Sequence, residues 1–309
     1  MVHVVAMHER PSAVLAGLVE FDDIVLLRRL PRGRVKEVDF NWSWGFKVGI
    51  GYNMMKHDEW DSQLYYTWFH TSKKQRAGIE STVQIPNAAG ALVSAGIDSL
   101  YTFPQSIGAV GNTTVFKSGE IDWNIRYNMF DWELGRNFYV SKHLALRPHV
   151  GIKGGWINQH INGHFDSFAD LRRTYHMDND FWGVGPSGGV NTKWNLGNVN
   201  THFFSLFGDF ASAYMWGCTH VKFDQNDPTF HDRELTSLGK NLGATMLQAF
   251  MGFGWDTNFH RDMCHFSMRL GYEYQQWFNQ LQLFSLLDYH RDNYDLTLQG
   301  GTLEIRFDF

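Results

Sequence analysis

The chain closes on the stretch Gly301-Thr302-Leu303-Glu304-Ile305-Arg306-Phe307-Asp308-Phe309. Apolar and polar residues alternate along it without a break, and successive side chains of a β-strand point to opposite faces. One face of such a strand is aliphatic and aromatic, while the other is polar and charged. A strand of a membrane β-barrel has this character, because its outer face meets lipid and its inner face meets an enclosed polar space. The stretch therefore predicts the last strand of such a barrel, provided that earlier segments repeat the pattern.

The composition agrees with a membrane barrel and excludes other classes of protein. The 309 residues carry a formal net charge of −5 and include 12 Trp, 12 Tyr, 25 Phe and 30 Gly. Abundant aromatic residues suit the interfacial girdles of a barrel, and glycines suit closely packed strands. The sequence lacks a run of about 18 apolar residues, which excludes a transmembrane helix. The nearly balanced charge gives no reason to expect a nucleic-acid partner.

Eight earlier segments alternate in the same way. The clearest is 39–53, where Phe40, Trp42 and Trp44 begin an apolar face. The others span residues 60–71, 121–134, 144–156, 181–196, 202–216, 242–255 and 266–275. Within 121–134 the apolar positions change from odd to even numbers near Phe130-Asp131, which predicts a β-bulge there. Because no amphipathic helix follows to cover these faces, lipid is their expected cover.

The connections between these segments alternate in length. Short turns are predicted near residues 54–59, 141–143, 197–200 and 258–262, and longer connections at 72–117, 160–176, 220–238 and 280–292. Outer-membrane barrels alternate short periplasmic turns with long extracellular loops in this manner. Such barrels also close with an even number of strands, so the nine visible segments imply one more strand before residue 39.

The sequence thus predicts an all-β fold, an antiparallel up-and-down transmembrane barrel of about ten strands. The barrel is assigned to residues 39–309, and residues 1–38 are interpreted as an atypical or truncated N-terminal segment. Neither a signal peptide nor a first strand can be recognised in that segment. Residues 11–30 are the expected place of the missing strand, although Pro11 and Arg28-Arg29 match it poorly.

Several segments resemble the Legionella-type major outer-membrane, pore-forming protein family, which is also found in environmental chlamydiae. They are the whole of 38–53, Trp68-Phe69-His70-Thr71, 134–141, Leu146-Arg147-Pro148-His149, 272–277 and 298–303. The resemblance covers residues 34–309 and implies an outer-membrane porin, often oligomeric, without a catalytic motif. It also implies disulfide-linked assemblies, with which this family is associated.

The inner face of the predicted barrel carries charges of both signs, and these are the candidate pore-lining residues. They are Lys47, Asp61, Asp122, Arg126, Arg147, Lys153, Lys193, Asp209, Arg269, Glu273, Glu304 and Arg306. A lumen of this kind holds water, admits small hydrophilic solutes and biases the passage of ions. In a barrel of about ten strands the same charges can instead pair into a plug. A porin for passive diffusion is preferred, and a plugged structural or adhesive surface protein is the alternative.

The connection 72–117 either folds into the lumen as a constriction or lies outside as a surface loop, and the second arrangement is preferred. His160 and His164 have the spacing of metal ligands on a helix, but they follow a strand in a Gly/Asn-containing segment, where solvation is expected. An outer-membrane hydrolase is the enzyme alternative, yet nothing places a nucleophile next to a base. The sequence therefore predicts no catalytic residue, no metal and no cofactor.

The two cysteines, Cys218 and Cys264, lack a CxxC motif. The predicted topology separates them by an apolar band about 25 Å tall, whereas a disulfide needs Cα atoms within about 7 Å. No intrachain disulfide is expected, and an intermolecular one stays open. The expected partners are thus outer-membrane lipid, small hydrophilic solutes, ions and a second copy of the chain, in the bacterial outer membrane.

Overall fold

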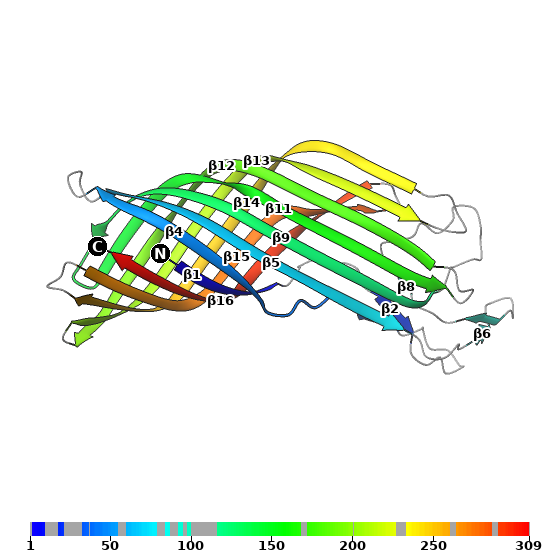
Figure 1. The fold of residues 1–309 in the computed structure, drawn as a ribbon, viewed down its shortest axis with the longest axis horizontal. Coiled ribbons are helices and arrows are strands. Elements are labelled where there is room, and N and C mark those ends of the chain that lie inside the picture. Colours follow the sequence, from blue (N-terminus) through cyan, green and yellow to red (C-terminus); the bar gives the residue numbers. More distant parts are fainter. Residues whose placement is uncertain are drawn as a thin grey trace.

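A barrel wall of ten antiparallel strands dominates the computed structural model (Figure 1). The structure describes residues 2–9, 18–21, 33–36, 38–54, 60–78, 84–86, 92–94, 98–99, 116–167, 172–199, 201–226, 233–259, 264–285 and 290–308. Within these ranges the strands of the wall are β1 (Val2–Glu9), β4 (Ser43–Met54), β5 (Trp60–Gly78), β9 (Phe116–Arg136), β11 (Leu144–Ser167), β12 (Arg172–Val199), β13 (His202–Asn226), β14 (Arg233–Phe259), β15 (Cys264–Ser285) and β16 (His290–Asp308). The predicted all-β, up-and-down fold is confirmed.

The wall closes between its last and first strands. Each strand pairs with its neighbours in chain order, and β16 then pairs with β1, which also pairs with β4. Val2 of β1 lies opposite Ile305 on one side and Val48 on the other. β1 is therefore the tenth strand, and it lies at residues 2–9 rather than within the expected 11–30.

Both chain ends lie at the same end of the barrel (Figure 1). At this end the short strand β10 (Phe138–Tyr139) precedes a turn, in which the amides of Val140 and Ser141 donate to the Leu144 carbonyl at 3.0 and 3.2 Å. We call this the turn end and the opposite one the outer end, since outer-membrane barrels keep short turns in the periplasm. Phe309, predicted on the outer face, lies outside the described residues.

Toward the outer end the strands extend far into three segments that were predicted as connections. Pairing continues to Asp166 opposite Arg172, to Gln225 opposite Arg233 and to Ser285 opposite His290. The predicted connections 160–176, 220–238 and 280–292 are therefore wrong over most of their length. β12 alone has 28 residues, whereas about 9–11 suffice to cross a bilayer. The wall thus continues well beyond the membrane.

A band of exposed apolar side chains covers the outside of the wall toward the turn end. It includes Trp44, Ile50, Leu64, Trp132, Val150, Phe210, Phe253, Leu270 and Phe307. Tryptophans mark its outer edge: Trp156 pairs with Trp182, and Trp68 and Trp156 flank the same β9 residue. Membrane barrels carry such a girdle of aromatic residues where lipid meets water. This aromatic band therefore marks the lipid-facing part of the wall.

Beyond the tryptophans the polarity of the wall is inverted, and β9 shows the change within one strand. Trp123 and Tyr127 are buried inside the barrel, while Phe130 and Trp132 are exposed outside. Pairing with both neighbours continues past Phe130 without irregularity, so the predicted β-bulge is wrong. The side chains of β9 continue to alternate between the two faces. The apolar environment is outside the barrel toward the turn end and inside it toward the outer end. Phe40, predicted on the outer face, is likewise buried against Trp123.

Three glycines form a row across the inner face of the wall. Gly155 of β11 pairs with Gly183 of β12, which pairs with Gly217 of β13. A Cβ atom at Gly217 would lie 1.8 Å from the Trp182 carbonyl oxygen, and one at Gly155 would lie 2.1 Å from the Asn128 carbonyl oxygen. Neighbouring backbones approach so closely here that only glycine fits, as at tight bends of barrel walls.

In the long connection between β5 and β9, β6 (Gln84–Pro86) lies beyond the outer end of the barrel, and β8 (Asp98–Ser99) lies beside β2 (Leu18–Phe21) near the outer end of β5 (Figure 1). β6 pairs with β7 (Leu92–Ser94) as a hairpin. β8 joins β2 and β3 (Gly33–Lys36) in a small separate sheet. These pieces agree with the preferred prediction of a surface loop. In the described part of the chain, we find no helix that is long and apolar enough to cross a membrane.

We expect deletion of residues 80–110 to leave the single-channel conductance unchanged, because β6 lies beyond the outer end of the barrel (Figure 1) and pairs with β7 rather than with a strand of the wall. Planar-bilayer recordings on the shortened and full-length proteins provide the comparison. A rise in conductance upon deletion would assign the connection to the lumen as a constriction instead.

Candidate functional site: a charged chamber

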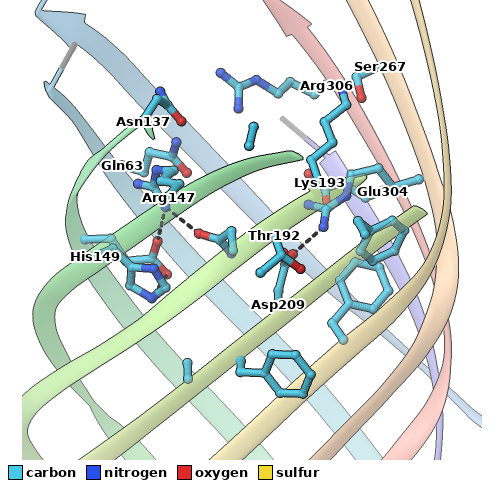
Figure 2. Close-up of a pocket in the computed structure, with 18 of the residues that line it drawn as sticks. Gln63, Asn137, Arg147, His149, Thr192, Lys193, Asp209, Ser267, Glu304 and Arg306 are labelled. Carbon is cyan, nitrogen blue, oxygen red and sulfur yellow. Dashed lines mark hydrogen bonds and ion pairs between the residues drawn. The ribbon is translucent and has the colours of Figure 1, made fainter. Parts of the chain in front are cut away.

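A polar chamber of about 410 Å³ occupies the barrel interior on the side of the turn end. Its lining comes from nine of the ten wall strands, β4, β5, β9 and β11 to β16, and from the short strand β10, so the site belongs to the whole wall rather than to one loop. Figure 2 shows Arg147 and His149 gathered on one side of the chamber and Asp209 and Glu304 on the other. The alternation of each strand explains the lining, because residues with the opposite parity form the aromatic band.

Arg147 of β11 holds the first of three charge networks. Its Nε atom donates to Asp61 Oδ2 at 2.8 Å, and its Nη1 atom donates to Glu133 Oε2 at 3.1 Å and to Asn191 Oδ1 at 2.8 Å. Gln63 also donates to Asp61, at 3.1 Å. A guanidinium with two carboxylates can be held in one orientation by its fixed fork of donors. The cluster therefore holds the guanidinium and its two carboxylates in fixed positions on one side of the chamber.

Arg269 of β15 holds the second network. Its Nη1 atom donates to Glu304 Oε2 at 2.9 Å, and Nη2 forms an ion pair with Asp209. The guanidinium also lies 3.9 Å from the centre of the Phe207 ring, within the range of a cation–π contact. These contacts fix Arg269 against the wall formed by β13, β15 and β16.

The third network joins four strands near the turn end. Lys193 Nζ donates to Asp256 Oδ2 at 2.6 Å, and His265 Nε2 lies 3.5 Å from Asp256 Oδ1. His265 Nδ1 lies 3.0 Å from Asp308 Oδ2, and Arg306 Nε donates to Asp308 Oδ1 at 2.7 Å. Charges of alternating sign therefore encircle part of the chamber mouth.

Two further charges face the chamber without an ion pair to another described residue. Lys47 Nζ lies 4.4 Å from the centre of the Tyr65 ring. The Glu273 carboxylate accepts hydrogen bonds from Gln248 at 2.8 Å, Gln275 at 2.8 Å and Thr302 at 3.1 Å. These three donors are neutral, so Glu273 faces the chamber as a hydrogen-bonded carboxylate outside any ion pair among the described residues.

The structure brings together ten of the twelve predicted pore-lining residues. Nine line the chamber: Lys47, Arg147, Lys153, Lys193, Asp209, Arg269, Glu273, Glu304 and Arg306. Asp61 is buried beside Arg147. The other two, Asp122 and Arg126, lie on the outside of β9, so their predicted inward orientation is wrong. There Asp122 Oδ2 forms an ion pair with Lys74 Nζ at 3.1 Å, and Arg126 is exposed. Their neighbours Trp123, Ile125 and Tyr127 occupy the interior instead.

Several lining residues were absent from the predicted set. They are Asp131, Glu133, His149, Asp256, His265 and Asp308. Lys153 forms an ion pair with Asp131, and His149 lies 3.9 Å from Glu133. Each of these residues neighbours an outward apolar residue in the sequence, such as Trp132 or Trp255. Strict alternation carried through 130–136 and 250–258 is the signal that could have found Asp131, Glu133 and Asp256. The alternation of their own segments already predicts an inward orientation for His149, His265 and Asp308.

An apolar core fills the interior of the outer half, directly beyond the chamber. Among its members are Ile121, Trp123, Tyr127, Ile157, Phe165, Phe181, Met215, Phe223, Met246, Trp277, Leu281 and Leu298. Some contacts cross the lumen: Tyr127 of β9 packs edge-on against Trp277 of β15 at 5.9 Å, and its hydroxyl donates to Gln275 Oε1 at 3.1 Å. The backbones of β12 and β15, three strands apart in the ring, approach within 8 Å. The outer half is therefore flattened around its own side chains.

His160 and His164 lie on the outer face of β11, not in a loop as predicted. His160 Nδ1 is 2.6 Å from Asp178 Oδ1, and His176 Nε2 is 2.9 Å from the same oxygen. No group of three or more His, Cys, Asp or Glu side chains suited to a metal ion occurs within the described ranges. Cys264 begins β15 at the turn end, whereas Cys218 lies beside Trp182 at the outer edge of the aromatic band.

A closed antiparallel wall, an apolar outside edged by tryptophans and a charged interior together define an outer-membrane β-barrel protein. Residues 7–309 match the family described as Legionella pneumophila major outer membrane protein precursor. The chain belongs to this family, and its location is the bacterial outer membrane. The family is one of outer-membrane proteins and not of enzymes. A comparison with individually curated proteins found no match.

Proposed function

We propose that this protein is a narrow channel for the passive diffusion of small hydrophilic solutes and ions, with the apolar core as its constriction. The observation that carries the proposal is the chamber, in which charges of both signs line a space of about 410 Å³ inside the lipid-facing part of the wall. Such a lining solvates ions and polar solutes, and a hydrophobic constriction in series gates a pore by excluding water.

The apolar core contains polar atoms that favour hydration. Both amide atoms of Gln159 and the indole nitrogens of Trp123 and Trp277 are buried without a hydrogen-bond partner among the described residues. Leaving such a group unpaired costs about 1–3 kcal/mol. Water entering the outer half would satisfy these atoms, which lowers the cost of opening the constriction.

A plugged structural or adhesive surface protein is the second candidate, and the packing across the lumen between Tyr127 and Trp277 favours it. Planar-bilayer recordings separate the two functions. Stepwise currents from the purified protein support the channel. Absence of current from protein whose folding is confirmed by gel mobility and circular dichroism supports the plugged barrel.

Glu273→Gln is expected to shift the permeability ratio of the channel toward anions by about twofold, because it removes a negative charge from the lining of the chamber. The reversal potential in a salt gradient measures this ratio. Glu120→Gln is the matched control, because Glu120 lies on the outside of β9, where it pairs with Arg76. Equal reversal potentials for Glu273→Gln and the unaltered protein would show that the current bypasses the chamber.

A further inference from the structure

Arg126 lies outside the barrel, one step beyond the tryptophan edge of the aromatic band. It pairs in register with His70 of β5 and with Asn158 of β11. Trp68 and Trp156 lie in the adjacent register row, nearer the turn end. The Arg126 side chain is exposed, and both flanking side chains are half-buried. This row therefore stands at the level where lipid headgroups meet the wall.

The other cations on this outer face are paired with carboxylates. Lys74 Nζ lies 3.1 Å from Asp122 Oδ2, and Arg76 pairs with Glu120. The hydrogen bond from Arg76 lowers the pKa of the Glu120 carboxyl, so that pair is charged at neutral pH. Farther along, Arg172 Nε lies 2.8 Å from Asp166 Oδ1. Each of these pairs stands farther from the tryptophans than Arg126 does.

Arg126, in contrast, forms no ion pair with another described residue. Its neighbours on the same face are neutral or weakly basic: Asn124, Asn128, His70 and Asn158. Asp180 is the carboxylate in its register row, opposite Asn158 on β12. That position is two strands away from Arg126, or about 10 Å. Arg126 is therefore a cation at headgroup level that, within the described residues, has no carboxylate partner and presents its donors to whatever lies against the wall.

We infer that Arg126, with His70 and Asn158, binds the phosphate group of an outer-leaflet glycolipid. A guanidinium offers a planar fork of donors that matches two phosphate oxygens, and such charge-assisted bonds are stronger than neutral ones. The imidazole and the amide on either side add further donors. Trp68 and Trp156 contact the apolar part of the same lipid, which distinguishes a lipid-linked phosphate from a free one.

The test reconstitutes the full-length protein in nanodiscs that contain a glucosamine-based glycolipid with phosphate monoesters. Native mass spectrometry measures how much glycolipid stays bound, and conductance is recorded on the same samples. Arg126→Gln should lower the bound fraction about tenfold, whereas Arg76→Gln, which removes a paired cation farther out, should leave it unchanged. Arg126→Lys should restore part of the binding, since it returns the charge without the fork.

The dephosphorylated glycolipid should bind the unaltered protein as weakly as the phosphorylated one binds Arg126→Gln. Three results would overturn the inference: retention of glycolipid by a folded Arg126→Gln, equal retention of the dephosphorylated lipid, or displacement of the lipid by millimolar inorganic phosphate. Conductance should be the same for Arg126→Gln and the unaltered protein, because Arg126 lies outside the lumen. Binding of the lipid and conduction through the channel are therefore tested independently of each other.

Discussion

Replacing both Trp123 and Trp277 by alanine should raise the single-channel conductance about threefold or more. Both side chains are fully buried in the apolar core. Trp277 packs against Tyr127 at 5.9 Å, and Trp123 packs against Phe40 at 5.4 Å. Removing the two indoles opens the flattened outer half at the place where contacts cross from β9 to β15. Water can then reach the chamber through a wider constriction, and planar-bilayer recordings measure the change.

The same substitutions should reduce stability, because large-to-small changes of a buried tryptophan cost about 3–5 kcal/mol each. Circular dichroism and heat-modified gel mobility therefore accompany the recordings, and each single variant serves where the double variant does not fold. Trp44→Ala is the matched control, since its indole is 72% exposed on the lipid-facing side. An unchanged conductance in a folded double variant would show that the apolar core is not the constriction.

Gly217→Ala should destabilise the barrel by about 3–5 kcal/mol or prevent its assembly. The added Cβ atom would lie 1.8 Å from the Trp182 carbonyl oxygen and 2.6 Å from Gly183 Cα. Both of these are backbone atoms of the neighbouring strand, so the clash is relieved only by separating β12 from β13. The broken pairing would lie in the middle of two of the longest strands.

Refolding into detergent micelles, followed by urea titration and gel mobility, measures this effect. Gly301→Ala is the control, because a Cβ atom at Gly301 has open space within 4 Å. The control should unfold at the urea concentration of the unaltered protein. If Gly217→Ala unfolds at that concentration too, the close approach of the strands at the glycine row is not required for the fold.

The lipid-facing part of the barrel could be predicted from the sequence because one rule holds throughout it. Leu303, Ile305 and Phe307 of β16 face outward as predicted, and Glu304 and Arg306 face inward. β5 follows the same rule, with Leu64 and Trp68 outside and Asp61 inside. Lipid on one side and water on the other give each residue type a single preferred face.

The outer half could not be predicted in the same way, because the rule reverses there. In β9, Trp123 and Trp132 differ in parity, yet each lies in an apolar environment. From alternation alone, this change of parity predicts a β-bulge. A bulge and a reversal of the apolar face produce the same sequence pattern. For the same reason, the polar outer face of β11 and β12 beyond Trp156 and Trp182 has the sequence character of a loop, although the two strands remain paired there.

The charged chamber could be predicted in part, and its missing members have a specific cause. Asp131 and Glu133 lie in the segment where the bulge was expected, so their orientation was ambiguous. Asp122 and Arg126 belong to the part of β9 in which the apolar face is inside the barrel. The alternation rule of the lipid-facing part therefore predicts the wrong face for them. β1 lacks a long aromatic face. Its pairing with β16 and β4 is a long-range contact, which local sequence patterns do not predict.

The reversal of polarity along single strands has a consequence for folding forces. Toward the periplasm the outer face of each strand is covered by hydrocarbon, so its stability depends on the surrounding lipid or detergent. Toward the cell exterior the same strand is held by exclusion of solvent from Trp123, Phe181 and their neighbours, as in a cytosolic domain. One continuous backbone is therefore subject to two different denaturation regimes, and the exterior segment can melt while the embedded segment stays intact.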